Sequence, residues 1–223
     1  DFIAETGMQQ GVGGFYSPQT KEIRGYHGVF GPSATTFGVL CHELTHQFQG
    51  LKLPDMNNFP VWIIEGMAVY FGDGARLDPD KREIVTGLIP RDRLIHLKEK
   101  IANGTNATLK GLIATKRQEM SGSLYADAWS LMYFLFAGPS CKAKGRPLII
   151  EYWLTGKERP LRPRDFEDLA TKYYGSMEAL EKLWIAHTVS LQPEPAGEIS
   201  KDIFESYEYK FKLRNTEQNT GER

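Results

Sequence analysis

The chain has 223 residues, which predicts one domain or two small ones and is long enough to bury a core without disulfides. Its 27 basic and 28 acidic side chains give a net charge of −1, which excludes the basic surface of a nucleic-acid binder and a broad attraction to anionic membranes. Two cysteines exclude a disulfide scaffold, and every apolar run is far shorter than the roughly 20 residues of a transmembrane segment.

The N-terminal part is predicted to be extended and is followed by a helix. Residues 8–30 have an extended pattern interrupted by the turn sequence Ser17-Pro18-Gln19-Thr20, which indicates a hairpin. Ser33 is a candidate N-cap, and Gly50 is a candidate C-terminal stop. Between them, apolar residues recur at helical spacing and predict a buried amphipathic helix: Phe37, Leu40, Leu44 and Phe48.

The rest of the chain is predicted to be mainly helical. A second helix is expected from Val61 to Phe71, before Gly72-Asp73-Gly74. Further helical patterns cover roughly residues 80–102, 107–119, 123–137, 146–155, 163–174 and 176–191. Beyond Pro193, alternating aromatic and charged residues at 207–213 predict one strand before a loose tail. We therefore expect an α+β fold, with one domain over residues 1–192 and an extension over residues 193–223.

The segment His42-Glu43-Leu44-Thr45-His46 carries the clearest chemical signal. On a helix, residues four apart lie on one face, so both imidazoles can reach the same metal ion. Glu43 lies beside them, where it can accept a hydrogen bond from a metal-bound water. This spacing is typical of the zinc motif of metalloproteases.

A third ligand is expected from the next helix. Catalytic zinc usually has three protein ligands and one open position. Glu65 is the one acidic residue in the apolar segment 61–71, and a carboxylate is costly to bury there without a cationic partner. The alternative for Glu65 is a solvent-facing or helix-capping side chain.

The motif and its neighbours resemble the gluzincin zinc metallopeptidases, which carry two histidines on one helix and a glutamate on the next. The separation of His46 from Glu65 and the run Trp62-x-x-Glu65-Gly66-x-Ala68-x-Tyr70 are similar to aminopeptidase N-like members. The segments 14–18, 125–129 and 180–184 resemble small peptidase MA-like families. The resemblance implies a zincin-like fold, in which a small N-terminal sheet and the active-site helix precede a mainly helical body.

The chain departs from these families in two places. The Gly-x-Met-Glu-Asn motif with which aminopeptidases hold a free amine is absent upstream of His42, which argues against aminopeptidase activity. Val69 stands where thermolysin-type enzymes carry an aspartate four residues after the ligand glutamate. The sequence therefore assigns no hydrogen-bond partner to either ligand histidine, although such partners normally set the imidazole tautomer.

The resemblance implies a zinc-dependent peptidase, most simply an endopeptidase acting on a peptide or protein. His42, His46 and Glu65 would hold one Zn²⁺, and Glu43 would be the general base for the attacking water. Tyr125 is the candidate donor to the oxyanion, with a packing tyrosine as the alternative. The extended segment Glu22–Gly28 is the candidate edge strand along a substrate cleft.

Two other classes of function stay open: a catalytically silent module that keeps this fold, and a zinc hydrolase of a non-peptide substrate. Export from the cytoplasm is an expectation drawn from the resemblance and from the absent initiator methionine. Cys41 is expected to be a small buried residue, and a disulfide between Cys41 and Cys141 has no support in the pattern. His27 could line the cleft, although a structural role is the simpler reading.

Overall fold

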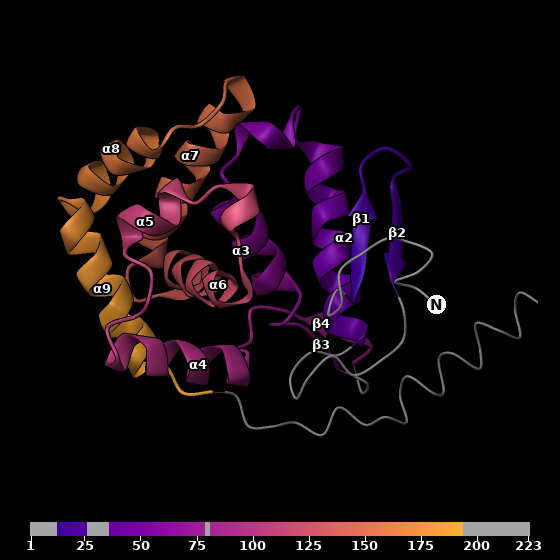
Figure 1. Ribbon diagram of the computed structural model, residues 1–223, viewed down its shortest axis with the longest axis horizontal. Coiled ribbons are helices and arrows are strands. Elements are labelled where there is room, and N and C mark those ends of the chain that lie inside the picture. Colours follow the sequence, from indigo (N-terminus) through magenta and orange to yellow (C-terminus); the bar gives the residue numbers. More distant parts are fainter. Residues whose placement is uncertain (1–12, 26–35, 79–80, 194–223) are drawn as a thin grey trace, which may run out of the picture.

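The structure is a computed structural model that describes residues 13–25, 36–78 and 81–193. The described part is mostly helical and contains two small antiparallel sheets of two strands each (Figure 1). The strands are β1 (Gly14–Ser17) paired with β2 (Glu22–Gly25), and β3 (Arg76–Asp78) paired with β4 (Glu83–Val85). The expected α+β class is confirmed at this level.

The predicted hairpin is present as β1 and β2. The strands pair from Gly14 with Gly25 to Ser17 with Glu22. The connecting turn is closed by the backbone N–H of Lys21, which donates to the Ser17 carbonyl at 2.8 Å. Lys21 has a φ of 57°, a left-handed conformation that the tight turn requires. The hairpin lies against α2 (Thr36–Lys52), as Figure 1 shows.

The first helix ends later than the sequence predicts. Gly50 lies inside α2, which continues to Lys52 before Pro54. Gly50 is required for packing instead, because a Cβ atom at residue 50 would lie 3.0 Å from the Tyr16 ring. The glycine therefore serves close approach by the hairpin and does not end the helix. The candidate N-cap Ser33 lies outside the described residues.

The apolar face predicted for α2 is present, but the expectation that it is buried is wrong. Leu44 and Phe48 are 49% and 57% exposed, and Leu40 and Leu51 are exposed on the same face. The opposite face, with Cys41, Thr45 and Gln49, is the buried one. Apolar periodicity identifies a helix but does not specify the face on which its neighbours pack. Here α3 and the hairpin cover the side that carries the histidines.

The second helix, α3 (Val61–Phe71), has the predicted bounds and packs on α6 (Gly122–Ala137). A Cβ atom at Gly66 would lie 2.8 Å from the Ala128 carbonyl oxygen, so the two helices approach closely at this glycine. In Figure 1, α6 lies in the middle of the helical body, with the other helices around it. Its residues Leu131, Phe134 and Leu135 are buried in the core.

The other helices surround α6 and complete the core. They are α4 (Arg91–Ala102), α5 (Leu109–Ala114), α7 (Arg146–Glu158), α8 (Pro163–Tyr174) and α9 (Met177–Ser190). Short turns of other helix types are η1 (Met56–Asn58), η2 (Arg117–Glu119) and η3 (Cys141–Gly145). Three fully buried tryptophans contribute the largest core side chains, namely Trp62, Trp129 and Trp184.

The predicted helix over residues 80–102 is wrong in its first half. The described part of this region contains β4 and a loop, and the helix begins only at Arg91. Pro90 takes the N-cap position, and a proline restricts the residue before it to extended conformations. Helix formation can therefore start only after Pro90.

Several sequence-based expectations concern termini, surfaces and cysteines. Residues 194–223 of the predicted extension 193–223, with the strand predicted at residues 207–213, lie outside the described residues. Within the described ranges, no helix has both the length and the apolar character of a membrane span.

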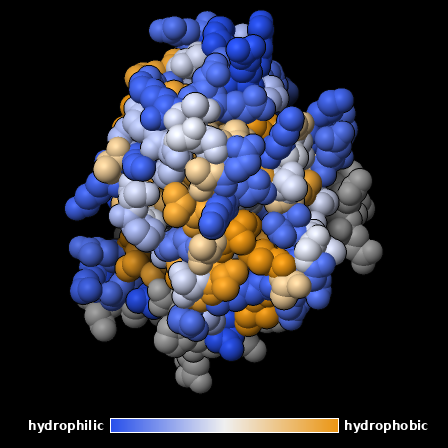
Figure 2. Space-filling view, turned by 90° about the vertical axis from the view of Figure 1, so that its left-hand side faces the viewer, coloured by the Kyte–Doolittle hydropathy of each residue, from blue (hydrophilic) through white to orange (hydrophobic). Residues whose placement is uncertain are grey.

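Apolar residues gather in the lower part of the face on which α9 lies, surrounded by hydrophilic ones (Figure 2). Cys41 is buried as expected, and both Cys41 and Cys141 are free thiols.

Candidate metal centre

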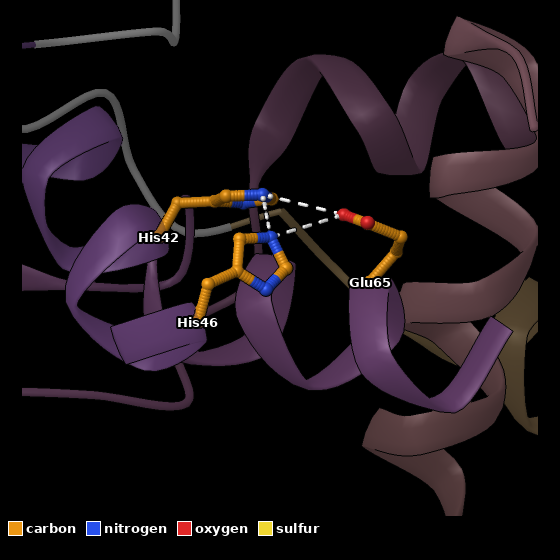
Figure 3. Close-up of side chains that lie close together, drawn as sticks. All are labelled: His42, His46 and Glu65. Carbon is orange, nitrogen blue, oxygen red and sulfur yellow. Dashed lines mark hydrogen bonds and ion pairs between the residues drawn. The ribbon is translucent and has the colours of Figure 1, made fainter. Parts of the chain in front are cut away.

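Two consecutive helices bring His42, His46 and Glu65 together. The two histidines project from one face of α2, and Glu65 points toward them from α3 (Figure 3). Oε2 of Glu65 lies 3.4 Å from Nε2 of His42 and 3.3 Å from Nε2 of His46. The two Nε2 atoms are 3.1 Å apart. The three candidate ligands predicted from the sequence therefore converge on one point.

Close packing of α2 on the end of α3 places His42. A Cβ atom at Gly72 would lie 2.7 Å from Cβ of His42 and 2.9 Å from its Cα. Such contacts are shorter than carbon atoms tolerate, so any side chain at residue 72 would push the helices apart. Gly72, predicted as a helix stop, thus also allows the helix that carries His42 to approach α3.

The charges of the group favour a shared cation. Burial alone would raise the pKa of Glu65, but hydrogen bonds from His42 and His46 outweigh it and lower the pKa to about 2. Burial alone would lower the pKa of His46, but its hydrogen bond to Glu65 outweighs that effect and raises the pKa. The carboxylate is therefore ionised and only 7% exposed, so it needs a positive partner.

The donor set and its spacing fit a zinc ion. Two imidazole nitrogens and one carboxylate oxygen are a known ligand combination for catalytic zinc. Tetrahedral ligands at 2.0–2.1 Å from an ion lie about 3.3 Å from one another. The ligand atoms here are 3.1–3.4 Å apart, so a cation could be held with little movement of the side chains. All three lie within 4.8 Å of one another, as a metal site requires.

Glu43 lies buried beside this group. Burial raises the pKa of Glu43, and the nearby His42 and His46 partly offset the rise. The backbone N–H of Tyr16 in β1 also donates to its carboxylate. A raised carboxyl pKa is suited to taking up and returning a proton near neutral pH. Glu43 therefore lies beside the candidate ligands, in surroundings that favour its protonated form.

Tyr125 comes to the site from α6. Its ring centroid is 6.4 Å from that of His42, and the guanidinium carbon of Arg93 lies 5.8 Å from the Tyr125 centroid. Arg93 is held in turn by an ion pair with Asp73. Burial, followed by the field of Glu65, raises the pKa of Tyr125 to about 12. The phenol therefore stays protonated and can donate a hydrogen bond.

Gln49 is a polar contact of the site that the sequence did not predict. Its Oε1 is 2.9 Å from Nδ1 of His46, and its Nε2 donates to the Ile64 carbonyl at 3.1 Å. The side chain is fully buried. The available signal was a glutamine three residues after a ligand histidine, which places the two side chains on one helix face. Val69 occupies the position at which thermolysin-type enzymes carry an aspartate, and it is a core residue here.

The strand that contacts Glu43 is β1, and the segment predicted as an edge strand along a substrate cleft, Glu22–Gly28, is a different one. A Cβ atom at Gly14 would lie 3.5 Å from Cγ of Glu43, and Tyr16 supplies the backbone hydrogen bond. The predicted edge segment is present only as β2, which pairs with β1. Residues 26–28, with His27, lie outside the described residues.

Comparison with known proteins gives one match, to a family model of unknown function. Residues 36–142 match the family described as "Protein of unknown function (DUF1570)". The matched stretch runs from the start of α2 to beyond α6 and therefore includes all of the candidate site residues. No curated protein and no solved structure matches the chain.

Proposed function

We propose that this protein is a zinc-dependent metallopeptidase of the gluzincin type with a zincin-like fold. The observation that carries the proposal is the convergence of His42, His46 and Glu65 beside the buried carboxylate of Glu43. A structural ion pair would need no second acid at this place. A zinc ion held by the three side chains would lower the pKa of a bound water toward ~7 and polarise a carbonyl oxygen.

Glu43 would move the proton in this reaction. Its carboxylate takes a proton from the attacking water and passes it to the amine that leaves when the peptide bond breaks. The raised pKa of Glu43 supports this role, because a carboxylate that binds a proton more readily accepts it from water more easily. The hydrogen bond from Tyr16 would keep the carboxylate oriented during the transfer.

Tyr125 would stabilise the negative charge that develops on the substrate carbonyl oxygen. Its protonated hydroxyl and its position near His42 support this role. The absence of an amine-anchoring motif before His42 favours an endopeptidase over an aminopeptidase. An extended peptide would then be the substrate.

The test combines metal analysis with proteolysis of an unfolded protein such as casein. We expect wild-type protein and Glu43→Gln to hold about one zinc each, while Glu43→Gln loses at least 100-fold in cleavage rate, the scale of general-base catalysis. Glu158→Gln, at an exposed glutamate of α7, is the matched control and should keep wild-type activity.

Four other outcomes would contradict the proposal. A purified protein that contains no zinc would contradict the proposed metal centre itself. Zinc with no cleavage of any peptide library would favour a silent module, and cleavage of esters alone would favour a non-peptide hydrolase. Equal proteolysis by Glu43→Gln and wild type would reject Glu43 as the base.

A further inference from the structure

We infer that Gln49 is a positioning residue of the metal centre, which sets the tautomer of His46 and holds that histidine at a fixed place relative to Glu65. The inference depends on the proposed metal centre. It does not depend on peptidase activity, because its consequences appear in zinc binding.

The orientation of the Gln49 amide follows from its partners. The Ile64 carbonyl can only accept a hydrogen bond, so the Gln49 atom that faces it at 3.1 Å must be the NH₂ group. The other end of the amide is then the carbonyl oxygen, which lies 2.9 Å from Nδ1 of His46. That oxygen can only accept, so Nδ1 of His46 must carry the proton.

This proton leaves the correct nitrogen of His46 free for a metal. In the neutral imidazole with hydrogen on Nδ1, the lone pair lies on Nε2. Nε2 is the atom 3.3 Å from Glu65 and 3.1 Å from Nε2 of His42. The opposite tautomer would place a hydrogen in the position of the metal. Outer hydrogen bonds of this kind typically change metal affinity by about 10- to 100-fold.

The second hydrogen bond of Gln49 joins the two helices that supply the ligands. Ile64 directly precedes Glu65 in α3, and Gln49 lies one turn after His46 in α2. The amide therefore links the segment carrying one ligand to the segment carrying another. A fully buried amide is costly unless it is hydrogen-bonded, and here both polar ends have partners. An apolar residue of similar size could fill the space, but it could make neither bond.

Thr45 provides a matched control for this role. It is a buried polar residue on the same helix, and its hydroxyl donates to the Cys41 carbonyl of α2 at 2.8 Å. Thr45→Val removes a buried hydrogen bond of α2 without removing a partner of His46. A purely structural contribution of Gln49 would make the two substitutions behave alike.

The experiment measures zinc affinity by competition with a chelator, in Gln49→Met, Thr45→Val and wild type. We expect Gln49→Met to bind zinc about 10- to 100-fold more weakly, and Thr45→Val to stay within about threefold of wild type. Equal affinity of Gln49→Met and wild type, or an equal loss in Thr45→Val, would overturn the inference. Wild-type protein that binds no zinc would overturn both the inference and the metal centre.

A second measurement keeps the inference testable if Gln49→Met does not fold. In ¹⁵N-labelled, metal-free wild type, at a pH at which His46 is neutral, the ring nitrogens of His46 should show a proton on Nδ1 and none on Nε2, because without a metal only the protein can set the tautomer. A proton on Nε2 would overturn the inference. If zinc binds and Nδ1 carries the proton, but no peptide is cleaved, the role of Gln49 stands and the proposed peptidase activity fails.

Discussion

Individual side chains at the site are understood only together with their partners. Glu65 is a buried carboxylate that would be expensive alone, and the imidazoles of His42 and His46 supply its hydrogen bonds. Burial of Tyr125, followed by the field of Glu65 and Glu43, disfavours its phenolate. It follows that Tyr125 can act as a hydrogen-bond donor over the whole range of neutral pH.

Replacing Tyr125 by phenylalanine tests its role at the residue scale. We expect kcat for an unfolded protein substrate to fall about 100- to 1000-fold, because one donor to the oxyanion is lost. The zinc content should stay at one ion, since Tyr125 is no ligand. Tyr173→Phe, which removes a hydroxyl bonded to Glu151 on the surface of α7 and α8, is the control. Unchanged kcat in Tyr125→Phe would assign the residue to packing.

At the scale of elements, the position of α6 decides whether Tyr125 reaches the site. Close to Tyr125 in α6, the carboxylate of Asp127 is fully buried and pairs with the Lys100 ammonium of α4. The same carboxylate accepts the backbone N–H of Ala107 at 3.1 Å. A buried carboxylate with these partners ties α4 and the loop before α5 to the start of α6.

Replacing Lys100 by methionine should destabilise the fold. The change leaves the Asp127 carboxylate buried without its cation, which typically costs about 3–5 kcal/mol in the free energy of unfolding. Denaturant titration measures the loss. Lys172→Met removes an exposed ion pair with Glu151 and should leave the midpoint nearly unchanged. A similar small effect for Lys100→Met would show that the buried pair does not hold α6.

At the scale of the whole molecule, the candidate metal centre joins α2 to α3, and α3 packs on α6 at the middle of the body. A metal that binds only the folded state therefore stabilises the arrangement of all three helices. In the absence of metal, the pair of His46 and Glu65 supplies part of this stabilisation, and its strength depends on pH.

The pH dependence has a defined sign. The raised pKa of His46 means that its contribution is fully present below about pH 6.5, the ordinary value, and is lost as pH rises through the higher folded value. The pKa of Glu65, lowered from 4.5 to about 2, means that its contribution is present above pH 4.5 and is lost as pH falls toward 2. The metal-free pair is therefore most stabilising between about pH 4.5 and 6.5. Zinc instead needs neutral imidazoles.

We expect the zinc-dependent rise in Tm to grow from pH 5.5 to pH 7.5. At a zinc concentration of 100 Kd, the stabilisation is about 2.7 kcal/mol, which for a protein of this size corresponds to roughly 5–10 °C. Thermal unfolding of zinc-loaded and chelator-treated protein at both pH values measures the difference. His42→Ala should abolish the rise. A rise that is larger at pH 5.5 would contradict binding by neutral imidazoles.

Much of the candidate site could be predicted from the sequence because its geometry is local. His42 and His46 lie one helical turn apart wherever α2 forms, and Glu65 belongs to a helix whose bounds were predicted correctly. Gln49 could not be assigned, because its role depends on the Ile64 carbonyl of another helix. The helix predicted across residues 80–90 failed because periodicity took no account of the restriction imposed by Pro90.

The sequence by itself determined which side chains can bind a metal, since their types and spacing along the helix are local properties. It also determined the α+β class and the mainly helical body, because apolar periodicity recurs in nearly every helix that forms. Only the tertiary structure decided which face of α2 is buried, which strand contacts Glu43, and which nitrogen of His46 is free. These features depend on contacts between segments far apart in the chain, and the close approach of α2 to α3 and the hairpin creates them.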